Sequence, residues 1–278
     1  MILVVGATAF FGRQAVETLA ARGVAVRALT RNPDAAGLPA GVDVVRADLT
    51  EPESLDPALE GVTAVLLVLP FGMDAGALLE RARGRKIVVL SSGAIEDDEA
   101  GQPDVIAAYH HDLERAVAAV TPQWTALRIL FPAINTLSFG HQLAHGDVVR
   151  VPYPGASSTA VHELDVAEAA AAVLTGDGHA GRVYTLTGPV ALTQEDQVSV
   201  LAEALARPLR TEAADPAAVL DQLSMFMDRD FAGALLGLLG RAEREPAPVT
   251  STVEDLTGRP ARPYAEWVRA NLPAFSSN

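Results

Sequence analysis

Short apolar runs alternate with amphipathic segments through the first half of the sequence. Apolar runs of this length predict buried strands, and segments with apolar residues at helical spacing predict helices. The predicted strands cover residues 2–5, 24–29, 42–46, 63–69, 86–90 and 124–130. The predicted helices cover residues 13–22, 51–59, 75–83 and 106–120. This alternation is typical of a doubly wound α/β sheet whose strands are parallel and buried on both faces.

The alternation becomes irregular after residue 132. The pattern there predicts helices at residues 135–145, 162–175, 193–206, 215–239 (in two pieces) and 264–271, and strands at 148–151 and 182–186. We therefore expect a Rossmann domain over residues 1–134 and a smaller α+β lobe over residues 135–278. Part of the segment 155–187 is expected to return to the Rossmann sheet. The lobe should lie over the carboxyl edge of the sheet, where such proteins bind ligands.

The first predicted strand ends in a glycine turn that leads directly into a helix. Gly6 permits the turn, Gly12 permits close packing of helix on strand, and the backbone N–H groups between them suit a dinucleotide pyrophosphate. The fingerprint G-x-x-G-x-x-G has its middle glycine where this chain has Ala9, whose methyl group argues against binding. The residues expected around the pyrophosphate are Gly6, Thr8, Ala9, Phe10, Phe11 and Gly12.

The end of the second predicted strand indicates which dinucleotide binds. An acidic residue there would bond the ribose 2′-hydroxyl and favour NAD, but the chain has Thr30 and Arg31. A guanidinium group pairs with a 2′-phosphate through two parallel hydrogen bonds. We therefore predict NADP(H) as the cofactor. The alternative is that Arg31 is an ordinary surface arginine.

Composition narrows the function. The 278 residues are 49% hydrophobic, which allows a large core, and carry a net charge of −14, which argues against nucleic acid as a partner. The absence of cysteine excludes disulfides, thiolate catalysis and cysteine–zinc sites. The first apolar run is too short for a signal peptide and lacks a basic segment before it. We expect a cytoplasmic monomer or homodimer with a small-molecule substrate and no membrane contact.

Several short motifs follow one another in a characteristic order. They are GAT (6–8) with Gly12, VRALTRNP (26–33), ADLT (47–50), LERA (113–116), WTALR (124–128), VHELDVA (161–167), YTLTGP (184–189) and LTGRP (256–260). Through them the chain resembles the NmrA-like, NAD(P)H-binding group of atypical short-chain dehydrogenases/reductases over nearly its whole length. The resemblance implies that Asp48 and Leu49 border the adenine. It also implies that Leu69, Pro70 and Ser91 flank the nicotinamide.

The chain departs from the superfamily in its proton relay. Short-chain dehydrogenases usually reduce carbonyl groups with a Tyr-x-x-x-Lys pair, in which the tyrosine protonates the substrate oxygen. None of the four tyrosines is followed by lysine four residues later, and Lys86, the only lysine, precedes the fifth strand at the wrong end of the sheet. The usual relay is therefore absent.

Other side chains are candidates to replace the relay. Ser91 and Ser92 lie at the carboxyl end of the fifth strand, and His110 is able to donate a proton near neutral pH. His110 also stands four residues before Glu114, where many relatives have lysine or histidine. The catalytic candidates are Ser91, Ser92, Tyr109 and His110, with Asn135 nearby. The alternatives are that residues 109–111 are an exposed helix start, and that water or a substrate hydroxyl supplies the proton.

Two further patterns concern the lobe. His141 and His145 lie one helical turn apart, but a zinc protease would need glutamate where the chain has Gln142, so we predict no metal and expect this helix to line the substrate pocket. Residues 225–227 (MFM) and Phe231 have helical spacing, which favours a core role over a pocket role. In the family the corresponding helices cover the substrate site, which fits an apolar or aromatic substrate.

We therefore predict an NADPH-dependent oxidoreductase that reduces a ketone, quinone or enone of a small or polycyclic aromatic substrate. A first alternative, motivated by the missing Tyr–Lys pair, is a non-catalytic redox sensor that binds NADP(H). A second, motivated by Ala9, is a cofactor-independent cyclase or isomerase on the same fold.

Overall fold

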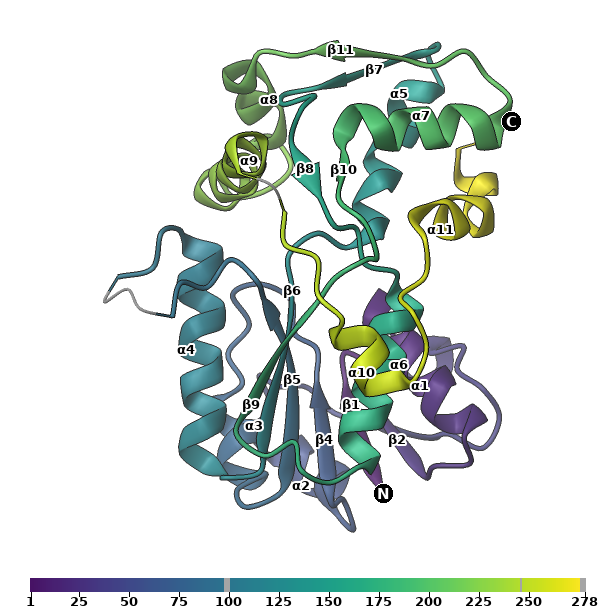
Figure 1. Cartoon of the computed structure of the whole chain (residues 1–278). Helices are drawn as coiled ribbons and strands as arrows, with labels where there is room; N and C mark the ends of the chain where they lie inside the picture. Colours follow the sequence, from purple (N-terminus) through teal and green to yellow (C-terminus); the bar gives the residue numbers. More distant parts are fainter. Residues whose placement is uncertain (98–100, 246, 276–278) are drawn as a thin grey trace.

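The computed structural model describes residues 1–97, 101–245 and 247–275. Its centre is a seven-stranded sheet with the strand order β3-β2-β1-β4-β5-β6-β9 (Figure 1). Its strands, all paired in parallel, are β1 (Ile2–Val5), β2 (Val26–Thr30), β3 (Asp43–Arg46), β4 (Ala64–Leu67), β5 (Lys86–Ser92), β6 (Trp124–Ile129) and β9 (Arg182–Leu186). The predicted doubly wound α/β fold is confirmed.

Helices cover both faces of this sheet. One face packs against α1 (Phe10–Ala21), α6 (Glu163–Thr175) and α10 (Thr252–Thr257), and the other against α2 (Leu55–Leu59), α3 (Gly76–Arg81) and α4 (Val105–Val120). Successive residues of a strand point to opposite faces. In β1, Ile2 and Val4 accordingly join the first core, and Leu3 and Val5 join the second. Burial on both faces explains why the strands read as unbroken apolar runs.

The remaining elements form a lobe beyond the carboxyl ends of the strands (Figure 1). They are α5 (Gly140–Leu143), α7 (Gln194–Leu205), α8 (Pro216–Leu223), α9 (Arg229–Arg244), α11 (Tyr264–Ala270), β7 (Val148–Val151), β8 (Ser157–Ser158), β10 (Leu192–Thr193) and β11 (Arg210–Ala213). Trp267 and Phe275 are fully buried at the centre of this lobe. Between the lobe elements the chain returns through α6 and β9 to the central sheet.

The structure differs from the sequence pattern at residues 135–145 and in short elements that the pattern does not predict, among them β8, β10, β11 and α10. Residues 135–145 are not one α-helix: a 3-10 helix over Ala133–Phe139 precedes the short α5. Ala133, Thr136 and Phe139 are its buried residues, and their spacing of three matches three residues per turn. The pattern also predicts neither β11 nor α10, because β11 is largely exposed and α10 buries one residue, so neither has an apolar period.

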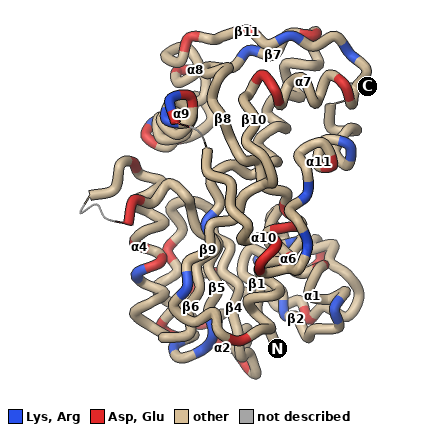
Figure 2. Tube along the Cα trace, in the orientation of Figure 1, with Lys and Arg blue, Asp and Glu red and all other residues tan. Residues whose placement is uncertain are grey.

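Charges are distributed over the whole molecule. Acidic and basic residues are interspersed along both the sheet domain and the lobe (Figure 2). None of the helices in the part of the chain that the structure describes is long and apolar enough to cross a membrane.

Candidate active site

The strand order of the sheet reverses between β1 and β4. The chain runs outward in opposite directions from these two strands, and ligands of open α/β sheets bind beyond the carboxyl ends at this point. Parallel pairing brings the ends of β1 to β5 to one edge of the sheet. The residues predicted there from sequence follow these strands: Gly6 after β1, Arg31 after β2, Asp48 and Leu49 after β3, Leu69 and Pro70 after β4, and Ser91 and Ser92 as the last residues of β5.

The glycine turn between β1 and α1 is built by close backbone contacts. Gly6 has φ +74°, and a Cβ atom there would lie 2.2 Å from the Val68 carbonyl oxygen. A Cβ atom at Gly12 would lie 2.1 Å from the Gly6 carbonyl oxygen. Neither contact is possible for a real side chain, so both glycines are required by the packing of α1 on β1 and β4.

Ala9 occupies the N-cap of α1 without strain. Its φ of −77° and ψ of 162° suit any L-residue, and it is exposed, as is Thr8. The helix has no side-chain cap, so the N–H groups of its first turn, at Phe10, Phe11 and Gly12, remain available for an anion. The chain's own backbone therefore accepts the Ala9 methyl group, and the first turn of α1 keeps the free N–H groups that bind an anion.

Two side chains, Arg13 and Asp48, order the end predicted to hold the adenosine half through two hydrogen bonds each. Arg13 of α1 donates to the carbonyl oxygens of Ala36 and Gly37 at 2.7 Å each, which fixes the loop after β2. The Asp48 carboxylate accepts the Thr50 N–H at 2.9 Å and the Thr50 hydroxyl at 2.8 Å. These two bonds lower the pKa of Asp48, with smaller contributions from Arg31 and Arg46. Among the described residues, exposed Arg31 has no hydrogen bond or ion pair, so its guanidinium group is free for a ligand phosphate.

The end predicted to hold the nicotinamide has a buried network that starts from Ser91. The Ser91 hydroxyl donates to Glu114 Oε1 at 2.5 Å. Arg128 of β6 donates from Nε to the same oxygen at 2.9 Å and from Nη2 to Glu114 Oε2 at 2.8 Å. Arg128 also makes two bonds of 2.8 Å to Asp97 and thereby lowers the pKa of that carboxyl. The Ser92 Oγ accepts the Ala94 N–H at 3.1 Å, a bond that does not use the Ser92 hydroxyl proton.

Tyr109 and His110 lie on α4 beside this network. The Tyr109 hydroxyl lies 2.8 Å from the Met73 carbonyl oxygen, to which it donates, and burial raises its pKa. His110 Nδ1 is buried without a hydrogen-bond partner, and burial lowers the pKa of His110 to about 4 despite the opposing effect of Glu114. His110 is therefore neutral near pH 7, and its neutral ring carries one N–H group. The alternative of an exposed helix start is wrong, because both side chains are at least partly buried.

Aromatic side chains connect this end to the lobe. The Phe71 ring lies 5.2 Å from Tyr109 and 4.6 Å from Phe231 of α9, measured between ring centroids. Phe231 thus belongs to an aromatic wall between the loop after β4 and the lobe. Met225 and Phe226, in contrast, are 71% and 80% exposed in the turn between α8 and α9, so the expectation of a core role was wrong for them.

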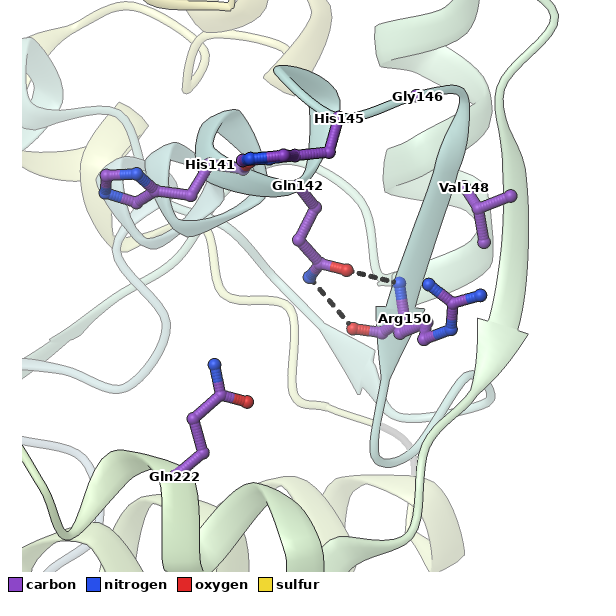
Figure 3. Close-up of a pocket in the computed structure, with 7 residues that line it drawn as sticks. All are labelled: His141, Gln142, His145, Gly146, Val148, Arg150 and Gln222. Atoms are coloured by element: carbon purple, nitrogen blue, oxygen red, sulfur yellow. Dashed lines mark hydrogen bonds between the residues drawn. The ribbon is translucent and has the colours of Figure 1, made fainter.

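His141 and His145 line a cavity of about 530 Å³ between α5, β7 and α8 (Figure 3). Gln142 and Gln222 point toward one another across it, and the Gln142 amide is fixed by bonds of 3.0 and 2.8 Å to the Arg150 backbone. His145 Nδ1 bonds the His141 carbonyl oxygen at 2.9 Å. The structure finds no group of three or more metal-ligating side chains among the residues it describes. Asn135 is exposed at the start of the preceding 3-10 helix.

The strand order, the glycine turn and the uncapped α1 define a dinucleotide-binding α/β protein. The NAD(P)H-binding family matches residues 6–177, and the chain belongs to this family, in its NmrA-like branch of atypical short-chain dehydrogenases/reductases. It is 37% identical over 286 residues to a (4-alkanoyl-5-oxo-2,5-dihydrofuran-3-yl)methyl phosphate reductase from Streptomyces griseus, covering 99% of each chain. It is 31% identical over 287 residues to an NAD(P)H azoreductase from Xenophilus azovorans, covering 100% of each chain.

A solved structure extends the comparison. The NADPH complex of an NADPH-dependent quinone oxidoreductase from Escherichia coli matches with a TM-score of 0.82 at 25% identity, covering 98% of this chain and 100% of that one. These three proteins are named as two reductases and one oxidoreductase. The chain is accordingly an NAD(P)H-dependent oxidoreductase.

Sequence reasoning missed Arg128, Asp97 and Arg13. Arg128 stands in a strand that is otherwise apolar, and a charged residue in a strand buried on both faces requires a buried partner. That signal was available in the sequence. The partners of Arg13 are backbone carbonyl groups, which leave no trace in residue identity.

Proposed function

We propose that the protein is an NADPH-dependent reductase whose substrate is a small, apolar or aromatic molecule with a conjugated acceptor, such as a quinone or an enone. The observation that carries the proposal is a glycine turn that leads into an uncapped helix N-terminus, in a chain without a Tyr–Lys relay. A simple ketone develops a localised oxyanion on reduction and needs a strong proton donor. A conjugated acceptor spreads that charge over several atoms. The missing relay therefore favours the conjugated substrates among those predicted from sequence.

The relatives support this choice. Their names specify an (alkanoyl-oxo-dihydrofuranyl)methyl phosphate, an azo compound and a quinone, each of which has a conjugated system that accepts reducing equivalents. The aromatic wall of Phe71, Tyr109 and Phe231 supplies an apolar surface at the nicotinamide end. Such a wall binds flat, conjugated molecules through their faces and edges.

The residues of the chain have separate tasks in this proposal. When bound, NADPH supplies the hydride. The α1 N-terminus holds the pyrophosphate, Arg31 pairs with the 2′-phosphate, and Leu69, Pro70 and Ser91 border the nicotinamide. Tyr109 holds the loop after β4 through Met73, so its hydroxyl is a structural contact. His110 offers a neutral N–H group, and water completes the protonation of the product.

Two assays test the proposal. The first follows NADPH fluorescence on titration with protein and asks whether the cofactor binds. The second compares NADPH oxidation with a quinone, an enone and a simple aromatic ketone. We expect turnover with the first two acceptors and at least about 100-fold lower kcat/KM with the ketone, the scale of a missing general acid. Equal rates with the ketone would contradict the choice of substrate class.

One observation favours a second function, that of a non-catalytic NADP(H) sensor. Met225 and Phe226 are strongly exposed, and adjacent exposed apolar side chains suit a protein partner. NADPH binding without turnover of any acceptor, together with a partner complex lost in the Met225→Ser, Phe226→Ser variant, would support the sensor over the enzyme.

A further inference from the structure

The network around Glu114 determines the direction of one hydrogen bond in the site. Glu114 Oε1 receives the Ser91 hydroxyl and Arg128 Nε, and Oε2 receives Arg128 Nη2. All three residues are at least nine-tenths buried. A carboxylate facing an arginine in this forked geometry is ionised and only accepts hydrogen bonds. The single Ser91 proton is therefore committed to Glu114.

This commitment limits what Ser91 does in the site. A hydroxyl has one proton and two lone pairs. With its proton held by Glu114, the Ser91 oxygen acts toward any ligand only as an acceptor. It cannot donate to a substrate oxygen, and it therefore recognises a donor such as an amide N–H or a hydroxyl group.

We propose that Arg128 and Glu114 are positioning residues that fix the Ser91 oxygen as an acceptor for a donor group at the nicotinamide end of the cofactor. The inference rests on the proposed function, because it requires NADPH at this edge. It assigns Arg128 and Glu114 a task beyond support of the fold.

Removal of Arg128 should reverse the hydrogen bond. The charged and titratable groups around Glu114 are Arg128 from β6, His110 from α4, and Asp97, which binds the other side of Arg128. Without Arg128 the Glu114 carboxyl group loses both arginine hydrogen bonds, and a buried carboxyl group without a cation partner takes up a proton. A protonated Glu114 donates to Ser91 and leaves the Ser91 proton free to turn toward the ligand, where it opposes a donor.

Three variants test the inference: Ser91→Ala, Arg128→Met and the double variant E114L/R128M. The probes are NADPH and 2′-phospho-ADP-ribose, which lacks nicotinamide. Ser91→Ala should weaken NADPH binding about five- to tenfold, the loss of one hydrogen bond. Binding of 2′-phospho-ADP-ribose should stay within about twofold of wild type, since only the nicotinamide end has changed.

The arginine variants separate positioning from support of the fold. Arg128→Met should bind NADPH more weakly, with an ionisation in the pH profile of binding that wild type lacks. Arg128→Met leaves a buried charge and lowers the melting temperature, whereas the apolar pair in E114L/R128M should restore it. The double variant should nevertheless keep a weakening of NADPH binding of about threefold or more, and Ser91→Ala should add little to it.

The contrary outcomes are equally definite. If E114L/R128M regains both its melting temperature and wild-type NADPH binding, the network is structural and the inference fails. Equal weakening of NADPH and 2′-phospho-ADP-ribose would also overturn it. The matched control is Arg27→Met. It also removes a largely buried arginine, which is bonded at 2.7 Å to Asp43, the first residue of β3. Absence of NADPH binding in wild type would instead refute the proposed function.

Discussion

The two halves of the cofactor edge are built by different means. At the pyrophosphate half, the site is made of backbone: Gly6 and Gly12 allow contacts that no Cβ atom fits, and α1 presents free N–H groups. At the half where we propose the nicotinamide, the site is made of side chains, with Ser91, Glu114 and Arg128 linked by hydrogen bonds. We expect NADPH binding and stability to fall when atoms are added to the backbone half. In the side-chain half, stability should fall when Glu114 or Arg128 alone is replaced, and it should recover when both are replaced by apolar residues.

The largest effect is expected from Gly12→Ala. The added methyl group would lie 2.1 Å from the Gly6 carbonyl oxygen and 3.2 Å from the Ala7 Cα atom, so α1 must move away from the turn. We expect at least about 3 kcal/mol of lost stability, or about 100-fold weaker NADPH binding if the fold survives. Thermal unfolding and fluorescence titration measure the two. The control is Gly23→Ala, where a Cβ atom meets nothing within 4 Å but φ is +71°: it should lower stability and leave NADPH binding unchanged.

This contrast also explains how much the sequence predicts. Glycine spacing and apolar runs report backbone geometry directly, so the fold and the position of Gly6–Gly12 follow from residue types. The nicotinamide half depends on which buried polar groups meet, and Ser91, Glu114 and Arg128 are far apart in the chain. Their pairing arises from the β5–β6 register, in which Ser91 lies beside Arg128, and this register is a property of the folded sheet.

The second prediction concerns His110 and tests whether the side-chain half is buried as described. Its folded pKa of about 4 is below the ordinary value of 6.5, so the unfolded chain binds more protons between these values. Stability due to this group is complete above pH 6.5 and is lost as the pH falls toward 4. The loss should reach about 2 kcal/mol, less than the full shift because the ring is partly exposed.

Denaturant unfolding of wild type and His110→Gln between pH 4.5 and 7.5 measures the effect. The stability difference between the two proteins should change with pH in this window. A constant difference would show that His110 is solvated, and the side-chain half would then be more open than the contacts indicate.

Arg31→Ala is the third test and extends the comparison to the 2′-phosphate. Loss of a forked guanidinium–phosphate contact should weaken NADPH binding about 10- to 50-fold and leave NADH binding unchanged. Arg46→Ala is the matched control, because Arg46 also lies near Asp48 and lowers its pKa. Equal losses of NADPH affinity in the two variants would indicate a general electrostatic effect of the surface rather than a contact to the 2′-phosphate.

Tyr109→Phe should have a smaller effect. The hydroxyl bonds the loop after β4 through Met73, and removal of such a bond costs about 1 kcal/mol, or roughly fivefold in kcat/KM. A tyrosine that protonated the substrate would instead cost about 100-fold or more in kcat. Steady-state kinetics with a quinone separate the two, and the larger loss would return Tyr109 to a catalytic role.

The smallest effect is expected from Ala9→Gly, which restores the glycine of the common fingerprint. If the Ala9 methyl group obstructed the pyrophosphate, its removal would tighten NADPH binding by a factor of ten or more. The exposed side chain and the φ of −77° argue otherwise. We expect NADPH affinity to change by less than about twofold and stability to fall by a few tenths of a kcal/mol, because glycine adds entropy to the unfolded chain. The backbone half then owes its function to Gly6, Gly12 and the free helix N-terminus, and the middle position of the fingerprint accepts any side chain that points to solvent.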